Sequence, residues 1–248
     1  MICSTPAFVL KSFDFRETSK IATFFTRDFG KVKGILKGIR KDHKKFGSTL
    51  CPLSLNHIVF YKNRNTEIYL VGQCDLIDDF GLSTPDLKSF GYAAHVSDLV
   101  DALMPLEDAH KNVFDLIFDF LNTVKDNGPD TRLTFQVKIL AHSGFKPHFD
   151  SCLNCSKKIA HDAFFSRLRG GLLCGSCISQ DKSAEQILKG TVSTILYIER
   201  SDWKSALRLN MQPAIRKQLD GVLRSFIQFH IGRALKSDKA VVGLLEGA

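Results

Sequence analysis

The chain has 248 residues, of which 44% are hydrophobic, so it can form one large domain or two to three small ones. No apolar run approaches the ~20 residues of a membrane-spanning helix, and the first ten residues lack the pattern of a secretory signal. We therefore expect a cytoplasmic protein with no membrane partner. The formal net charge is +8, with basic residues in excess over 1–80 and 151–248 and acidic residues in excess over 81–150. This segregation favours a polyanionic partner, although a generally basic surface is the alternative.

Residues 7–80 read as five short strands rich in β-branched and aromatic residues. The expected strands cover 7–13, 20–26, 30–38, 55–61 and 67–71. A glycine stands inside the third strand, where a strand that closes a small barrel must coil. The pattern predicts a closed barrel of the OB type over residues 1–80, with an SH3-like barrel as the alternative.

After Gly81 the apolar residues recur every three to four positions, which indicates amphipathic helices. We expect a helix that Thr84 and Pro85 begin, a second over about 113–124, and a third between 127–129 and 143–144. Pro213 begins a last helix whose apolar stripe runs to His230. Acidic residues among the first helices read as a solvated face, or else as a surface for a basic protein. They are Asp98, Asp101, Glu107, Asp108, Asp115 and Asp119.

Two Cys-x-x-Cys pairs, separated by eighteen residues, have the spacing of a four-thiolate zinc site. Four thiolates close the coordination sphere, so we expect one structural Zn²⁺ per chain. Redox dithiols and two disulfides are the alternatives. The predicted fold class is therefore α+β multi-domain: an OB-type barrel over 1–80, then a helical domain over 81–248 carrying a zinc-finger-like segment at about 150–180. The proposed ligands are Cys152, Cys155, Cys174 and Cys177.

A run of basic residues with the single acidic Asp42 lies between the third strand and Cys51. Such a run is an electrostatic footprint for nucleic acid, because each phosphate contact releases counterions; a solvated loop is the alternative. Aromatic residues interleave with it, and one or two exposed ones could stack on bases. Arg167 and Arg169, between the cysteine pairs, are a second candidate for phosphate contact. The run comprises Lys31, Lys33, Lys37, Arg40, Lys41, Lys44 and Lys45.

Signatures of enzymes are missing from the sequence. It has no phosphate-binding loop, no Gly-x-Ser-x-Gly and no His-Glu-x-x-His. Asp75, Asp78 and Asp79 could form a two-metal nuclease cluster, but they read better as an acidic turn at a strand end. His57 and His230 read as partly buried residues and not as general bases. We therefore expect no catalytic residue and no enzymatic activity.

Several segments, taken in order, resemble the RecO family of bacterial DNA repair proteins. They are 17–26, 29–33, 37–40, 50–52, 140–147 and 230–237. The resemblance implies an OB-fold, a helical domain with a zinc site, and a mediator that binds single- and double-stranded DNA and anneals complementary strands. It also implies that the protein acts with RecR to load RecA onto DNA coated by single-strand-binding protein. The expected location is the cytoplasm, and the nucleoid during repair. Some members lack the cysteines, so zinc is not intrinsic to the activity. The family's basic barrel segment falls here on Lys31, Lys33, Lys37, Arg40 and Lys41.

The resemblance further implies that the helical domain binds the acidic tail of single-strand-binding protein. By charge alone, the candidates for this contact are Arg216, Lys217, Arg224 and Arg233. The alternative function, from a different class, is a zinc-containing adaptor that mainly binds acidic protein tails.

Overall fold

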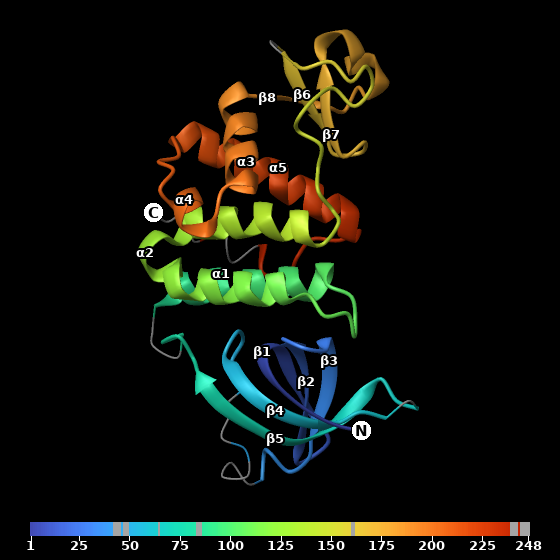
Figure 1. Cartoon of the computed structure of the whole chain (residues 1–248), viewed down its shortest axis with the longest axis vertical. Coiled ribbons are helices and arrows are strands. Elements are labelled where there is room, and N and C mark those ends of the chain that lie inside the picture. Colours follow the sequence, from blue (N-terminus) through green and yellow to red (C-terminus); the bar gives the residue numbers. More distant parts are fainter. Residues whose placement is uncertain are drawn as a thin grey trace. The chain divides into compact units, whose positions relative to one another are not determined.

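The N-terminal part of the chain is a closed five-stranded barrel in the computed structural model (Figure 1). Neighbouring strands follow the order β1-β2-β3-β5-β4, and β4 pairs with β1 to close it. The structure describes the whole chain except residues 42–45, 47–49, 64, 83–85, 160–161, 239–242 and 244–248. The barrel strands are β1 (Ile2–Phe15), β2 (Ser19–Thr26), β3 (Gly30–Leu36), β4 (Leu55–Tyr61) and β5 (Ile68–Asp78).

The strand pairing confirms the predicted OB-type barrel over the SH3-like alternative. β3 and β5 pair in parallel, whereas the other neighbours are antiparallel. A parallel pair requires a crossover connection, and here the segment containing β4 provides it. Gly34 of β3 faces the crowded interior, because a Cβ at this position would lie 2.4 Å from Cγ2 of Val71. The glycine inside the third strand therefore serves close packing between strands.

The chain forms two compact units. Unit 1 comprises Met1–Lys125 and Leu235–Ala248, and unit 2 comprises Asp126–Ala234. The predicted boundary between residues 80 and 81 follows the change from strands to helices and stays a prediction. Among the described helices, none is long and apolar enough to cross a membrane.

Two helices follow the barrel. Asp86 caps the N-terminus of helix α1 (Leu87–Leu103), and its carboxylate accepts a hydrogen bond from the Lys88 amide. The predicted cap at Thr84 and Pro85 lies outside the described residues. In unit 1 the start of helix α2 (Lys111–His142) packs on the barrel, with ring centroids of Phe8 and Phe114 4.7 Å apart.

The prediction of two separate helices on either side of residues 127–129 was wrong, because α2 continues from Lys111 to His142 with Pro129 inside it. Proline lacks an N–H donor and disfavours a helix interior, which is why the sequence suggested a break. Val124 before the proline and Leu133 after it are both buried, and this packing overrides the local preference. Phe118, which the apolar spacing within 113–124 places on the buried side of that helix, is 43% exposed.

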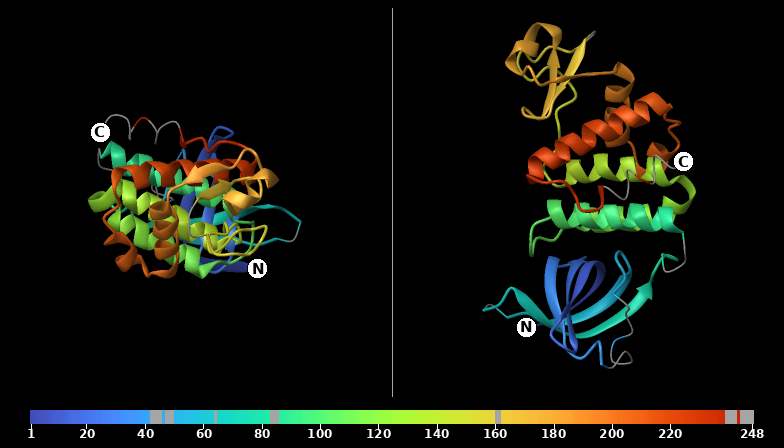
Figure 2. Two further views of the ribbon diagram at one scale, coloured as in Figure 1. Left: turned by 90° about the horizontal axis from the view of Figure 1, so that it is seen from above. Right: turned by 180° about the vertical axis from the view of Figure 1, so that it is seen from behind.

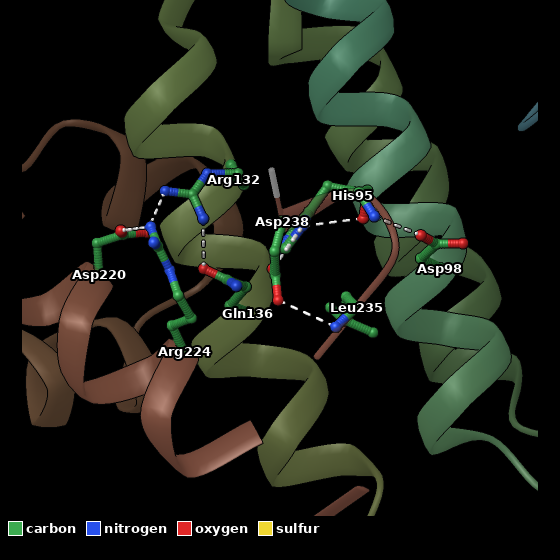
Figure 3. A network of polar contacts seen from close by, with 9 residues as sticks. His95, Asp98, Arg132, Gln136, Asp220, Arg224, Leu235 and Asp238 are labelled. Carbon is green, nitrogen blue, oxygen red and sulfur yellow. Dashed lines mark hydrogen bonds and ion pairs between the residues drawn. The ribbon is translucent and has the colours of Figure 1, made fainter. Parts of the chain in front are cut away.

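The segment after the last helix returns to α1 within unit 1. The Ser237 amide donates to Asp98 at 3.0 Å, and the Ser237 hydroxyl lies 3.3 Å from Nδ1 of the buried His95. Asp238 lies 3.6 Å from the same nitrogen and accepts a hydrogen bond from the Leu235 amide, as Figure 3 shows. These contacts place residues 235–238 in the same unit as the barrel.

Unit 2 combines a small sheet with a group of helices (Figure 2). The sheet has the order β7-β6-β8. In the interior, Arg132 of α2 donates to Asp220 at 2.5 Å and to Gln136 at 3.0 Å, and Asp220 also pairs with Arg224 (Figure 3). The elements are β6 (Ala163–Ser166), β7 (Gly171–Cys174), the 3-10 helix η1 (Gly175–Gln180), β8 (Glu185–Ile187), α3 (Lys189–Arg200), α4 (Trp203–Leu207) and α5 (Pro213–Ile231).

Candidate metal centre and nucleic-acid interface

The four predicted cysteine ligands meet in unit 2. Cys152 and Cys155 lie in the loop before β6, Cys174 ends β7, and Cys177 lies in η1. Their sulfur atoms all lie within 4.8 Å of one another, and the sulfurs of Cys155 and Cys174 are 3.9 Å apart. Four sulfurs at about 2.3 Å from a tetrahedral Zn²⁺ would be about 3.8 Å apart. The donor set and its spacing therefore fit a closed four-thiolate metal site.

Hydrogen bonds favour a thiolate at Cys152. At Cys177 the hydrogen bond from Asn154 also favours one, but the neighbouring cysteines and burial outweigh it and raise the pKa of Cys177 to about 11. The Cys174 amide donates to Sγ of Cys152, and the Asn154 side chain donates to Sγ of Cys177, both at 3.4 Å. Burial opposes ionisation of Cys152, but hydrogen bonds from backbone amides outweigh it and lower the pKa of Cys152 to about 6. Thiolates are the form in which cysteine binds metal. All seven cysteines are free in the structure.

The sheet beside the cysteines carries Arg167 and Arg169 at the turn between β6 and β7. Both side chains are exposed. The turn is held by a chain of hydrogen bonds: the Arg169 amide donates to the Ser166 hydroxyl at 2.9 Å, and that hydroxyl donates to Asp181 at 2.6 Å. The hydrogen bonds to Asp181 lower its pKa below the ordinary value, so its carboxylate is ionised at neutral pH. The two arginines thus lie at the tip of the β6–β7 hairpin, where their side chains are exposed.

Lys31, the first residue of the predicted basic run, is used inside unit 1. Its ammonium group donates to the Asp101 carbonyl at 2.5 Å and lies 3.5 Å from the Asp101 carboxylate. Burial lowers the pKa of Lys31, although Asp101 opposes the shift. The contact with Asp101 joins β3 to α1. Because the Lys31 side chain is only 11% exposed, it presents little surface to a ligand.

The rest of the run lies on the outer wall and at one end of the barrel. Lys33 is half-buried on β3, and Lys37, Arg40 and Lys41 are exposed on the segment that follows β3. Lys44 and Lys45 lie outside the described residues.

The turn between β1 and β2 adds two cations that the sequence analysis missed. Arg40 donates from its side chain to the Arg16 carbonyl and from its backbone to the Thr18 carbonyl, both at 3.0 Å. Asp14 lies 3.3 Å from Lys20 and 3.4 Å from Arg40, so it pairs with both cations. Antiparallel pairing places the end of β1, the start of β2 and the end of β3 side by side, and this brings the cations of these three segments together. We call Arg16, Lys20, Lys37, Arg40 and Lys41 the basic end of the barrel.

Most aromatic residues that interleave with the basic run fill the interior. Phe24, Phe25, Phe46 and Phe60 are buried. Phe15 is half-buried, with the Arg16 guanidinium 5.2 Å from its ring centroid. Two aromatic rings on the barrel strands are largely exposed: Tyr61, at 45%, and Phe13, at 51%. The sequence analysis did not single out Phe13, because no alternation with buried residues marks this end of β1: Ser12 is half-buried and Asp14 is exposed.

The four cations predicted on the last helix differ in their surroundings. Arg216 forms two hydrogen bonds with Asp130, at 2.6 and 2.9 Å, and Arg224 pairs with Asp220. Lys217 and Arg233 are exposed. The structure therefore does not gather the four residues into one site.

Lys217 lines a groove of about 490 Å³ in unit 2. Arg167 at the hairpin tip also lines it, and Phe165, Leu188 and Val222 supply apolar surface. The groove thus combines apolar surface with two cations and one carboxylate, Glu185, and its net positive charge suits an acidic peptide with bulky apolar residues. The sequence reasoning missed this pairing of Arg167 with Lys217, because the two residues are fifty positions apart.

The acidic residues at the end of β5 form turns. The Phe80 amide donates to Asp78 at 2.7 Å, and the Gly81 amide donates to Asp79 at 2.9 Å, as in Asx turns. Asp75 accepts a hydrogen bond from Gln73. Within the described part of the chain, the cysteines are the group of His, Cys, Asp and Glu residues arranged to hold a metal ion. The nuclease alternative therefore receives no geometric support.

Comparison with known proteins gives a consistent result over nearly the whole chain. Residues 1–80 match the family model described as Recombination protein O N terminal, and residues 84–239 match Recombination protein O C terminal. Among curated proteins, the chain is 28% identical to the DNA repair protein RecO of Alkaliphilus metalliredigens over 236 residues, which is 94% of this chain and 95% of the relative. It is 27% identical over 236 residues to that of Caldanaerobacter subterraneus (94% of each chain) and 28% identical over 233 residues to that of Myxococcus xanthus (93% of each chain).

Proposed function

Since the chain belongs to the RecO family of DNA repair and recombination proteins, we propose that its barrel binds single- and double-stranded DNA and promotes annealing of complementary strands. The observation that carries the proposal is the basic end, where Lys37, Arg40 and Lys41 are exposed beside the β1–β2 turn. Loops at this position of an OB-fold commonly bind nucleic acid. Cations there attract phosphates whatever the base sequence.

The proposed mechanism is non-covalent. Cations on the barrel, together with Arg167 and Arg169 in unit 2, neutralise phosphates and lower the repulsion between two strands. The bases stay free to pair, because phosphate contacts leave their hydrogen-bonding edges open. No bond is made or broken by the protein, so we propose no enzymatic activity.

The cysteine cluster has a structural role in this proposal. Cys152, Cys155, Cys174 and Cys177 would hold one Zn²⁺, with all four positions taken by protein sulfur. Such an ion links the loop before β6 to β7 and η1, and thereby positions the arginines at the hairpin tip. In this proposal the Zn²⁺ ion would cross-link these segments, and it would have no open coordination position for a reaction.

The protein partners in this proposal are RecR, single-strand-binding protein and, indirectly, RecA. The acidic tail of single-strand-binding protein would lie in the groove between Arg167 and Lys217, where cations flank apolar surface. This assignment moves the predicted tail contact away from Arg216 and Arg224, which already form ion pairs with Asp130 and Asp220. The place of action would be the cytoplasm and the nucleoid.

Strand annealing tests the proposal. The protein should accelerate pairing of two complementary oligonucleotides without ATP, both free and coated with single-strand-binding protein. No acceleration in either case would contradict the mediator function. The adaptor alternative, in which the basic surfaces mainly bind acidic tails, predicts tight binding of a tail peptide and weak binding of DNA when each is titrated over a series of salt concentrations. Lys217→Glu should weaken binding of the peptide, and Lys204→Glu, on α4, is a control with the same change of charge.

A further inference from the structure

Six apolar side chains on the outside of the barrel are joined by the register of the strands. Phe13 pairs with Ile21, Ile21 with Ile35, Ile35 with Leu70, Leu70 with Tyr61, and Tyr61 with Ile2. The row therefore passes over all five strands and begins and ends on β1. We call Ile2, Phe13, Ile21, Ile35, Tyr61 and Leu70 the outer stripe.

The stripe lies on the outer face because its members alternate with core residues. Cys3, Phe60 and Leu36 are core neighbours of Ile2, Tyr61 and Ile35 along the chain. Ile2 is 67% exposed and Leu70 is 40% exposed, whereas Ile35 is half-buried and Ile21 is buried. The exposed members, Ile2, Phe13, Tyr61 and Leu70, lie outside the core, so their exposure points to a ligand, while Ile21 and Ile35 connect them.

Tyr61 lies against the barrel wall at a glycine. A Cβ at Gly72 of β5 would lie 3.0 Å from Cε2 and 3.5 Å from the hydroxyl of Tyr61. The absence of a side chain at residue 72 thus leaves room for the ring on the strand. A ring supported in this way presents a flat aromatic surface with little rotamer entropy to lose on binding.

Positive charge accompanies the stripe. Lys33 lies two residues from Ile35 on the same face of β3, and no carboxylate in the described ranges pairs with it. At the other end of the stripe, Phe13 and Ile21 adjoin the basic end, where Lys20 precedes Ile21. A ligand that covers the stripe must therefore offer flat apolar groups and negative charges together.

We propose that the outer stripe binds the bases of unpaired nucleotides, with Tyr61 and Phe13 as stacking residues and Lys33 and the basic end as phosphate contacts. The inference rests on the proposed DNA binding and adds a preference for single strands. Unpaired bases expose their faces for stacking, whereas a duplex buries them and can use only the cations. The charge beside the stripe favours nucleic acid over an apolar protein partner.

The test compares Tyr61→Leu, Phe13→Leu and Tyr61→Phe with the parent protein. Leucine keeps the surface apolar and removes the ring, and phenylalanine keeps the ring. Tyr197→Leu is the matched control, because Tyr197 is also 45% exposed but lies in unit 2. Binding of a labelled oligonucleotide and of the duplex of the same sequence is measured by anisotropy at several salt concentrations, with circular dichroism to check folding.

Each leucine variant should weaken single-strand binding roughly 5- to 100-fold, and leave duplex binding and the salt dependence unchanged. Tyr61→Phe and Tyr197→Leu should bind as the parent does. Unchanged single-strand binding in both leucine variants would overturn the stacking proposal while leaving DNA binding intact. An equal loss of affinity for the single strand and for the duplex would overturn it too. If the parent protein binds neither the single strand nor the duplex, the result would instead contradict the proposed function itself.

Discussion

Replacement of Asp220 by alanine should destabilise unit 2 strongly. The Arg132 side chain is only 2% exposed, and its guanidinium donates to Asp220 and Gln136. Without Asp220, a cation would remain in the interior without its counter-charge. Breaking such a buried pair by removing one partner typically costs about 3–5 kcal/mol. This is a large part of the roughly 5–15 kcal/mol that stabilises a typical domain.

Two further variants separate the buried charge from other effects. Arg224→Ala removes the other partner of Asp220, but Arg224 is 34% exposed, so the expected cost is about 1 kcal/mol or less. The double variant Arg132→Met with Asp220→Ala removes both buried charges and should recover most of the stability that Asp220→Ala loses.

Urea unfolding of the full chain measures these free energies. The single tryptophan of the sequence, Trp203, is buried in α4, so its fluorescence reports on unit 2. The reasoning would be refuted if Asp220→Ala cost no more than Arg224→Ala. A double variant as unstable as Asp220→Ala alone would equally show that an uncompensated charge is not the cause.

Three other predictions concern the metal, a tyrosine and the hairpin tip. Metal analysis should give about one Zn²⁺ per chain, and Cys152→Ser should lower the midpoint of thermal unfolding far more than it lowers DNA affinity. Burial, and then the hydrogen bond to Glu107, raise the pKa of Tyr69 to about 12. The stability from its neutral form is therefore complete below the ordinary pKa of about 10 and is lost as the pH rises through about 12. An ultraviolet titration of the four tyrosines should show the last transition move to lower pH in Glu107→Gln. Arg167→Ala with Arg169→Ala should weaken duplex and single-strand binding alike and reduce the salt slope by about one to two units, as anisotropy titrations would measure.

The positions of the barrel strands could be predicted because each is rich in β-branched and aromatic residues, but the expected 7–13 and 67–71 cover only parts of β1 and β5. The expected 20–26 and 55–61 differ by at most one residue from β2 and β4. The parallel pairing of β3 with β5 could not be read from either strand, since register depends on residues that are distant in the chain. The outer stripe exists only through that register, and the sequence therefore did not reveal it.

The candidate sites show the same limit. The cysteines were predictable because two short motifs define the ligands and their approximate separation. Lys31 resembled the other lysines in the sequence, but Asp101 on α1, seventy positions away, draws its ammonium into a buried contact. The groove beside Lys217 likewise depends on β6 and α5 lying together, for which the sequence carries no local signal.

The most direct test of DNA binding by the barrel is the salt dependence of single-strand affinity in Lys37→Ala, Arg40→Ala and Lys41→Ala combined. If these side chains contact phosphates, the variant should bind every sequence more weakly, and the slope of log K against log salt should flatten by roughly two to three units. The matched control replaces Lys182, Lys189 and Lys204 of unit 2 by alanine and should keep the parent slope. A slope unchanged in the barrel variant would contradict the assignment of DNA binding to the basic end.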